Sequence, residues 1–362
     1  MSFLKVAVSE NLCQADSIAT ESDEDVKATG HRAAVVGAGL MGRRHAESLD
    51  AIRGVEIVGV CDLSAQAAQS LAEVYGCRAS TEISALLTDN SIDIVVIATG
   101  DRHHLDAAAA AIAAGRNVFI EKPLASTVAD AQLIADLADQ SDRVVTVGHQ
   151  LRIDPRFAGA SEAVLSGSFG SLAHASFRRN SSIAGPRRYG SSTTLPWHVM
   201  IHDVDLLRFI TGLEVLSVYA RGAKVSDTES DLDSLLVVAD LSDGSIASFE
   251  SSWVLPEAVD TSLDAIANIV CVNGSAVVTS AEQGLSIVDE RGRRYPDTVR
   301  YFAIDGRSSG LLHAQARRFV DAIDGYGAPL CSAFDGLEAV RVIEAVDSSL
   351  ASGRPEHVVR NP

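Results

Sequence analysis

The sequence is short of paired cysteines and of long hydrophobic runs, and both shortages exclude whole classes of protein. Its five cysteines are scattered and form no Cys-x-x-Cys pair, which argues against a disulfide framework or a zinc ribbon and indicates a reducing cytoplasm. No apolar run approaches the roughly 20 residues that span a bilayer. The opening segment also lacks the basic and apolar pattern of a secretory signal, so we expect a cytoplasmic protein. The cysteines are Cys13, Cys61, Cys77, Cys271 and Cys331.

Positive charge is also scarce. The formal net charge is −18, so the chain repels nucleic acid and anionic membranes, and we expect neither as a partner. A small molecule is then the expected ligand. Arginine supplies nearly all of the 30 positive charges, so a lysine inside a motif stands out as a candidate functional group. The lysines are Lys5, Lys27, Lys122 and Lys224.

The order of apolar segments predicts two domains after a leader or arm of residues 1–30. Over residues 31–150, strands without polar alternation are spaced by helices, which is typical of a doubly wound parallel sheet covered on both faces. Over residues 151–362 the strands alternate in polarity and two helices follow, around residues 310–324 and 335–352, which predicts an α+β domain.

Two turn pairs punctuate the strands of the second domain. Asp243-Gly244 and Asn273-Gly274 each lie between two strand-like segments, as in two-residue hairpins. We expect glycine to take a positive φ in both turns.

A glycine pattern opens the first domain. Gly37, Gly39 and Gly42 form Gly-x-Gly-x-x-Gly between a predicted strand and a predicted helix, which is the context that the Rossmann dinucleotide fingerprint requires. With Leu40 and Met41, this turn would hold a pyrophosphate at the helix N-terminus. The alternative is an ordinary glycine turn.

An acid follows at the distance that the fingerprint predicts. Asp62 ends the next strand, 20 residues after Gly42 (62 − 42), where a carboxylate accepts from the hydroxyl groups of the adenosine ribose. A 2′-phosphate would be repelled there, and Leu63 and Ser64 offer no compensating arginine. The sequence therefore favours NAD over NADP, the alternative being a solvated acid.

Three motifs in order resemble the Gfo/Idh/MocA oxidoreductases, the family of glucose–fructose oxidoreductase and inositol dehydrogenase. The resemblance covers residues 32 to about 355 and includes the final helix, DGLEAVRVIEAVDSSLASGRP. One segment departs from the family pattern, because Gly100 and Asp101 replace a usual proline and asparagine. The matching segments are GxGxxGxxH ending at His45, ATGDRHH over residues 98–104, and Glu121-Lys122-Pro123.

The resemblance implies an N-terminal Rossmann domain and a second domain built on a large, open, mostly antiparallel sheet. It also implies substrate between the two domains and a homodimer or homotetramer formed by the outer face of that sheet. Besides the glycine loop and Asp62, it implies that the cofactor is lined by Thr99, Asp101, His104, Glu121 and Lys122.

Hydride transfer from a secondary alcohol needs a base for the hydroxyl proton and a group that stabilises the developing alkoxide. Lys122 follows the fifth strand, at the edge of the sheet where such folds bind ligands, and its ammonium can stabilise that oxygen. Glu121 would orient it. A cis peptide bond before Pro123 is compatible with the turn. The alternative for Lys122 is an ordinary surface lysine.

The segment MIHDVDLLRFITG places two histidines four residues apart. The family places an acid/base histidine at the start of a helix here, with an aspartate four residues earlier; His202 matches the histidine, but His198 occupies the position of the aspartate. We assign His202 as base and His198 as proton relay or substrate ligand, against the alternative of ordinary core or surface histidines. Asp205 would fix the His202 tautomer or be a solvated acid. The two histidines have no third metal-ligating residue nearby in the sequence, so we do not expect a metal site.

Arginines precede this helix. The segment RRNSSIAGPRRYG carries Arg178, Arg179, Arg187 and Arg188, which predict an anionic substrate or, equally, surface pairs with local acids. Arg188 and Arg152, the latter just past the last Rossmann strand, are candidate substrate ligands together with His198 and His202.

These features predict an NAD-dependent dehydrogenase acting on a secondary hydroxyl of a sugar, a polyol such as inositol, or a sugar derivative. Three alternatives stay open: an NAD-assisted glycoside hydrolase, an NAD-binding regulator without turnover, and a sugar ketoreductase. The departure at His198 keeps the regulator open, and the intact Lys122 weighs against it.

Overall fold

The computed structural model describes residues 30–257, 263–280, 284–290 and 292–360. The expected leader over residues 1–30 therefore lies outside the described residues, apart from Gly30.

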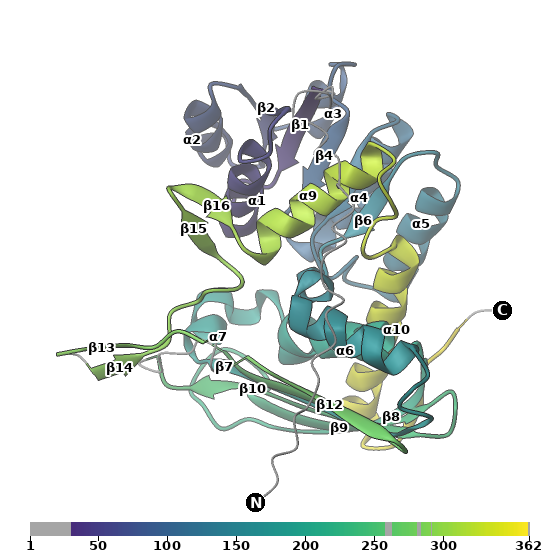
Figure 1. Cartoon of the computed structure of the whole chain (residues 1–362). Coiled ribbons are helices and arrows are strands. Elements are labelled where there is room, and N and C mark those ends of the chain that lie inside the picture. Colours follow the sequence, from purple (N-terminus) through teal and green to yellow (C-terminus); the bar gives the residue numbers. More distant parts are fainter. Residues whose placement is uncertain (1–29, 258–262, 281–283, 291, 361–362) are drawn as a thin grey trace, which may run out of the picture.

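A six-stranded parallel sheet forms the first layer of the molecule, in the order β3-β2-β1-β4-β5-β6. Its central strands read IVVI and NVFI and are buried along their whole length, because helices cover both faces (Figure 1). The doubly wound sheet is therefore as predicted. The elements are β1 (His31–Val36), α1 (Leu40–Asp50), β2 (Val55–Cys61), α2 (Ala65–Tyr75), β3 (Arg78–Ser80), α3 (Ile83–Leu87), β4 (Ile94–Ile97), α4 (His104–Ala113), β5 (Asn117–Ile120), α5 (Val128–Asp139) and β6 (Val145–Val147).

A seven-stranded sheet forms the second layer, in the order β12-β11-β7-β10-β9-β8-β17. Among the described strands of this sheet, β7 and β10 alone run parallel to each other, so the sheet is mixed and mostly antiparallel. Side chains along β9 alternate between buried and exposed, since one face carries helices and the other is open. The strands are β7 (Leu172–Ser182), β8 (Val215–Ala223), β9 (Ser234–Leu241), β10 (Ile246–Leu255), β11 (Leu263–Cys271), β12 (Gly274–Thr279) and β17 (Glu356–His357).

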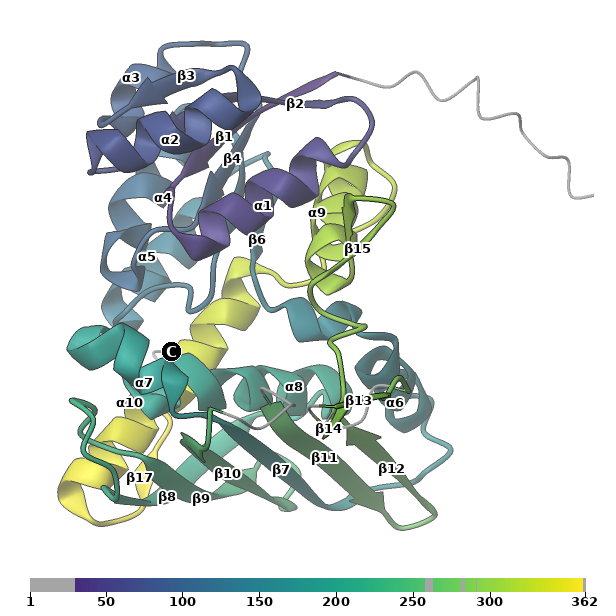
Figure 2. The same ribbon diagram turned by 90° about the vertical axis from the view of Figure 1, so that its left-hand side faces the viewer.

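Helices cover the inner face of this sheet and connect it to the first (Figure 2). The longest, α10 (Ala333–Ser352), packs against β8 at one end and against α5 at the other. The π-helical turn η4 (Pro196–Met200) runs directly into α8 (Ile201–Thr211). The remaining elements are η1 (Asp101–His103), η2 (Gln150–Ile153), α6 (Pro155–Leu165), α7 (Ala184–Tyr189), η3 (Gly190–Ser192), the hairpins β13 (Ile287–Asp289) with β14 (Gly292–Arg294) and β15 (Phe302–Ile304) with β16 (Arg307–Ser309), and α9 (Leu311–Ile323).

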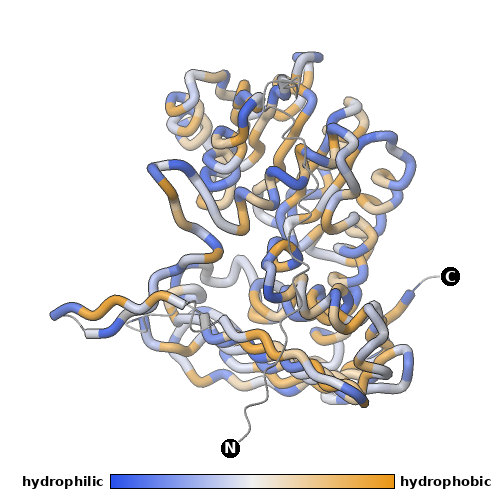
Figure 3. Tube along the Cα trace, viewed as in Figure 1, coloured by the Kyte–Doolittle hydropathy of each residue, from blue (hydrophilic) through white to orange (hydrophobic). Residues whose placement is uncertain are grey.

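Helix α9 returns to the first sheet although it follows the second in the chain. Its Ala316, Phe319 and Val320 share one buried cluster with Ala33 of β1 and Phe119 of β5. The hydropathy colouring shows the corresponding hydrophobic stretches along the first sheet (Figure 3). The segment from residue 151 onward therefore supplies one of the helices that close the first domain's core.

Both predicted hairpins form, but only one uses glycine as predicted. Gly244, between β9 and β10, has φ +87°. Gly274 pairs with Cys271 and is not among the residues with positive φ, so the prediction of a positive φ there is wrong. Glycine is required at this position for another reason, because a Cβ would lie 2.7 Å from the ring of Phe169.

Candidate active site

The first strand ends in a turn that leaves no room for side chains at two of its three glycines. Gly37 has φ +99°, and a Cβ there would lie 2.5 Å from the carbonyl oxygen of Ala98. A Cβ on Gly42 would lie 1.7 Å from the carbonyl oxygen of Gly37. Both positions therefore require glycine, because any side chain would force the strand-to-helix turn apart.

Gly39 is different, because the space beside its Cα is empty and leaves the backbone of the turn accessible to a ligand. It is the N-cap of α1, no side chain caps the helix, and a Cβ there would meet nothing within 4 Å. The first helical N–H groups, at Leu40 and Met41, have no acceptor within the helix, and the helix dipole favours negative charge there. The turn is therefore a cradle of the kind that binds a pyrophosphate.

Asp62 lies at the end of β2 and is bonded to this turn. Its Oδ2 accepts from the backbone N–H of Ala38 at 2.7 Å, and its Oδ1 accepts from that of Ser64 at 2.8 Å. The carboxylate is only partly buried, so each oxygen keeps a lone pair for a ribose hydroxyl. The turn and the acid together fit a dinucleotide with an unphosphorylated 2′-hydroxyl.

The loop after β4 lies on the same edge of the sheet. Thr99 and Asp101 are partly exposed there, and Asp101 opens the short turn η1. His104 is 1% exposed; its Nδ1 lies 2.9 Å from the carbonyl oxygen of Pro123 and its Nε2 lies 3.3 Å from that of Thr99. We therefore revise the predicted role of His104 from direct contact with the cofactor to support of the loop that carries Thr99.

Glu121 is buried beneath Lys122 rather than facing the cleft. Its Oε1 lies 2.6 Å from Nε2 of His45, and its Oε2 accepts from the backbone N–H of Lys122 at 3.0 Å. Burial alone would raise the pKa of Glu121, but these bonds and the nearby positive charges hold it below its usual range. The carboxylate therefore stays charged and fixes the backbone of Lys122.

Lys122 reaches across to the second domain. The peptide bond between Lys122 and Pro123 is cis. Its Nζ donates to the carbonyl oxygen of His198 at 3.0 Å, in the π-helical turn that precedes α8. Burial lowers the pKa of Lys122, while the charges of Glu121 and Asp101 oppose that effect. The ammonium thus links the edge of the first sheet to the turn that carries His198.

His198 and His202 lie in consecutive helical turns near this ammonium. Burial, followed by the charge of Lys122, lowers the pKa of His198 to about 3. The same two causes lower the pKa of His202 well below its usual value. Both imidazoles are therefore neutral at physiological pH, as a proton acceptor must be before reaction.

His149 joins this group and was not identified from the sequence. It follows β6, the last parallel strand, and is 1% exposed. Its ring centroid lies 6.5 Å from that of His202, with the two rings nearly perpendicular. A signal was available, because His149 follows its strand at the same edge of the sheet as Asp62 and Lys122.

The prediction that Arg152 binds substrate is wrong. The guanidinium is buried and donates to both carboxylate oxygens of Asp205, at 2.7 to 3.1 Å, and to the carbonyl oxygen of Leu330. Asp335 lies 3.2 Å away. Arg152 therefore joins α8 to α10, and Asp205 faces Arg152 and His149 and makes no direct bond to His202.

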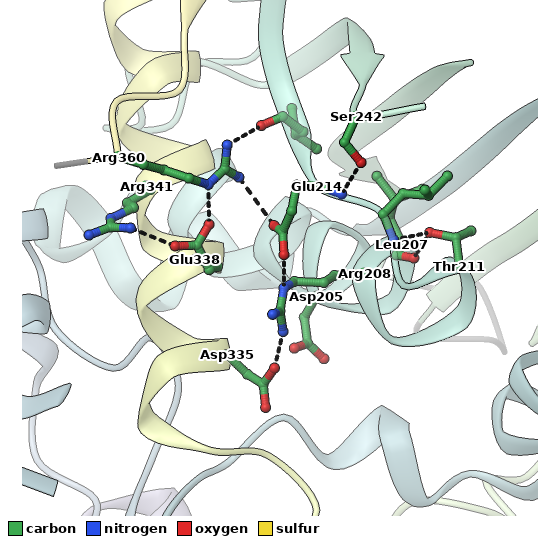
Figure 4. A network of polar contacts seen from close by, with 12 residues as sticks. Asp205, Leu207, Arg208, Thr211, Glu214, Ser242, Asp335, Glu338, Arg341 and Arg360 are labelled. Atoms are coloured by element: carbon green, nitrogen blue, oxygen red, sulfur yellow. Dashed lines mark hydrogen bonds and ion pairs between the residues drawn. The ribbon is translucent and has the colours of Figure 1, made fainter. Parts of the chain in front are cut away.

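Further ion pairs hold α8 against α10 (Figure 4). Arg208 of α8 bonds Asp335 at the start of α10 and Glu214 just after α8. Glu214 and Glu338 both accept from Arg360, which closes the network. This network fixes the orientation of the helix that carries His202.

Most of the predicted arginine cluster is already paired, as the alternative interpretation held. Arg178 bonds Asp264 and Arg187 bonds Glu257, both at the surface. Arg179 lies in β7, not in a loop, and forms a buried pair with Asp203 at 2.6 Å. Arg188 has no ion-pair partner among the described residues.

Arg188 lines an open cleft of about 790 Å³ between the two domains. The first domain contributes the loop around Asp101, and the second contributes the segments around Arg188 and Thr228. The charge of Asp101 raises the pKa of Lys122, so the Asp101 side of this cleft lies near that lysine. Lys122, His149, His198 and His202 are not among the residues that line this cleft.

Two family models match successive parts of the chain. One, described as an oxidoreductase family with an NAD-binding Rossmann fold, matches residues 31–149, and the GFO/IDH/MocA C-terminal domain matches residues 157–277. The chain belongs to the Gfo/Idh/MocA oxidoreductase family. Its first domain is an NAD-binding Rossmann fold, so the cofactor predicted from the glycine loop and Asp62 is confirmed.

Relatives match nearly the whole chain. It is 27% identical over 330 residues to inositol 2-dehydrogenase of Rhizobium meliloti strain 1021, covering 89% of this chain and 98% of the relative. It is 25% identical over 332 residues to scyllo-inositol 2-dehydrogenase (NAD(+)) of Bacillus subtilis strain 168, covering 90% and 95%. The crystal structure of GenD2 from gentamicin A biosynthesis in complex with NAD matches with a TM-score of 0.80 at 26% identity, covering 92% and 97%.

Two absences concern the described part of the chain alone. Every helix in it is too short or too polar to span a bilayer. No three metal-ligating side chains from His, Cys, Asp and Glu gather there in a way that would hold a metal ion.

Proposed function

We propose that this protein is an NAD-dependent dehydrogenase that oxidises a secondary hydroxyl group of a polyol or sugar. The observation that carries the proposal is the meeting of Lys122 with the turn of His198 and His202, beside a loop that belongs to the cofactor edge. The names of the inositol dehydrogenase relatives support a polyol as the substrate class.

The neutral His202 is the base in this proposal. Its low pKa keeps the ring unprotonated, so it can accept the hydroxyl proton of the substrate. Lys122 hydrogen-bonds the same oxygen, exchanging its bond to the His198 carbonyl for one to the developing alkoxide. When bound, NAD accepts the hydride.

The substrate contacts of His198 and Arg188 are part of the proposal. His198 adjoins Lys122 and would bind a neighbouring hydroxyl or relay the proton. Within this segment, an anionic substrate now depends on Arg188 alone, since the other three arginines of the segment are paired. A neutral polyol or sugar is therefore favoured.

The decisive experiment follows reduction of NAD over a panel of inositols, aldoses, uronates and sugar phosphates. We expect substrate-dependent NADH formation that Lys122→Ala abolishes while NAD binding persists. Arg317→Ala is the control for loss of a positive charge, because Arg317 pairs with Asp321 on the exposed side of α9, and we expect it to turn over normally.

Other outcomes would replace the proposal. Glycoside cleavage without net NADH would indicate an NAD-assisted hydrolase. NAD binding without turnover on any substrate would indicate a regulator, and activity only with a sugar ketone and NADH would indicate a ketoreductase.

We also propose that the outer face of the second sheet pairs two copies of the chain. Large hydrophobic side chains are exposed there on β8, β9, β10 and β12, whereas single-chain proteins seldom leave such a patch open. The exposed fractions are 44% for Leu216, 58% for Leu236, 54% for Val238, 49% for Ile246 and 62% for Val277.

We further propose a cytoplasmic location, which we infer from the state of the cysteines. Cys61, Cys77, Cys271 and Cys331 are all unpaired thiols, and three of these four are buried. Unpaired thiols of this kind support a reducing compartment such as the cytoplasm.

A further inference from the structure

His149 is buried with both ring nitrogens lacking a hydrogen-bond partner among the described residues. An imidazole that is 1% exposed would normally have its donor and its acceptor satisfied, because a buried polar group without a partner destabilises the fold. Such an arrangement is typical of a group that works with a neighbour in the site rather than one that only packs.

The surroundings of His149 select one tautomer. Its Nδ1 lies 3.6 Å from Oδ2 of Asp205, whose carboxylate forms a buried ion pair with Arg152. A carboxylate on that side favours a proton on Nδ1. The Nε2 of His149 is then a lone-pair acceptor, because burial, aided by the charges of Arg152 and Lys122 and opposed by that of Asp205, lowers the pKa of the ring and keeps it neutral.

His202 has the complementary need. To act as a base toward the cleft it must carry a lone pair on Nε2, and its proton must then sit on Nδ1. That Nδ1 is buried and has no hydrogen-bond partner among the described residues. The acids of its own helix do not supply one, because Asp203 is bonded by Arg179 and Asp205 by Arg152.

We propose that Asp205 and His149 form a positioning relay that fixes the tautomer of His202, an inference that rests on the proposed dehydrogenase function. The carboxylate of Asp205, 3.6 Å from Nδ1 of His149, holds a proton on that nitrogen by its charge, and Nε2 of His149 accepts from Nδ1–H of His202 through one bridging water molecule. The ring centroids are 6.5 Å apart, a span that one bridging oxygen atom completes. His202 takes the substrate proton on Nε2 and keeps its Nδ1 proton throughout, so no proton passes along the relay.

The tautomer itself can be measured without any turnover. In the full-length protein labelled with ¹⁵N-histidine, we expect the wild-type spectrum to show His202 protonated on Nδ1 and unprotonated on Nε2. In His149→Phe, which removes the acceptor but keeps a ring of similar volume, the proton should move to Nε2. A wild-type His202 protonated on Nε2, or a tautomer that His149→Phe leaves unchanged, overturns the relay.

Kinetics then separate positioning from packing. We expect His149→Phe to fold with unchanged or higher thermal stability, since it removes unsatisfied buried nitrogens. Its kcat should fall by at least about 10-fold, with KM little changed, because only the acid–base step is affected. His149→Gln retains an acceptor and should recover part of the loss. Wild-type kcat in His149→Phe contradicts the proposal.

A double-mutant cycle tests whether His149 acts through His202. In the His202→Gln background, adding His149→Phe should cause no further loss of kcat, because the group that it positions is already gone. Independent, multiplicative losses would overturn the relay. If the wild type turns over no substrate, the dehydrogenase proposal fails, and the ¹⁵N spectrum still decides the relay by itself.

Discussion

At the scale of single residues, we expect the glycines after β1 to serve two purposes: Gly42 is required by the fold, and Gly39 is required by cofactor binding. Gly39→Ala introduces a methyl group into open space at an allowed backbone conformation, φ −72° and ψ −165°. We expect the thermal stability of the free protein to stay unchanged and the Kd for NAD to rise at least about 10-fold, since the methyl group occupies the pyrophosphate cradle.

Gly42→Ala is the contrasting variant. Its methyl group would collide with the backbone of Gly37, so we expect a loss of thermal stability before any cofactor is added. Calorimetry on both variants, with and without NAD, makes the comparison. Equal destabilisation of the two free proteins would contradict this account of the loop.

The site residues whose local structure agrees with the sequence prediction share one physical property. Gly37, Gly39, Gly42 and Asp62 act through local geometry, a strand-to-helix turn followed by the next strand, and local geometry is readable from spacing. Arg152 was misassigned because its partners, Asp205 and Asp335, are remote in sequence. Pairings between remote side chains depend on packing that no spacing reveals.

At the scale of elements, one buried ion pair fastens α8 to the second sheet. Arg179 of β7 and Asp203 of α8 are both almost fully buried, and burial raises the pKa of Asp203 despite the adjacent guanidinium. Arg179→Leu leaves this carboxylate buried without a partner. We expect a loss of about 3–5 kcal/mol in the free energy of unfolding, measured by urea denaturation.

The neighbouring arginine provides a matched control. Arg178 pairs with Asp264 near the surface, so Arg178→Leu should cost no more than about 1 kcal/mol. Replacing both members of the buried pair, Arg179→Leu with Asp203→Leu, should recover most of the loss. Similar effects of the two single arginine variants would show that burial does not govern the strength of this pair.

The elements themselves were largely predictable, and their partners were not. Buried runs such as IVVI and NVFI predict parallel strands directly, since both faces of such strands must be covered. No pattern indicated that β7 and β10 run parallel within the second sheet, or that α9 returns to the first. Both depend on contacts between segments far apart in the chain.

At the scale of the whole molecule, a histidine joins the first strand to the end of α9. Nδ1 of His31 lies 2.5 Å from Oδ2 of Asp93, and its Nε2 lies 3.0 Å from Oδ1 of Asp324. Burial lowers its pKa, but these two acids outweigh burial and raise it above the usual value of 6.5. The stabilisation is therefore complete below the unfolded pKa of about 6.5 and is lost as pH rises through the higher folded value.

His31→Asn should accordingly lower the Tm more at about pH 6 than at about pH 9. The difference in Tm between wild type and variant, measured across this range, tests the prediction. A difference that stays constant or grows with pH would show that His31 stabilises the fold as a neutral group.

The open face of the second sheet predicts the assembly state. Leu236→Asp places a charge in the centre of the exposed hydrophobic patch, so we expect sedimentation to show a shift from oligomer to single chains. Leu133→Asp, which changes a similarly exposed leucine on α5 of the first domain, should leave the assembly intact. A wild type that sediments as a single chain at all concentrations would exclude the interface.

The return of α9 to the first sheet bears on the order in which the molecule is completed during translation. The strands of the first sheet leave the ribosome long before α9, yet Phe319 and Val320 of α9 close the cluster that contains Ala33 and Phe119. A nascent chain that has delivered every strand of the cofactor domain therefore still exposes one hydrophobic face. The cofactor domain can become fully native only after nearly all of the second domain has been synthesised.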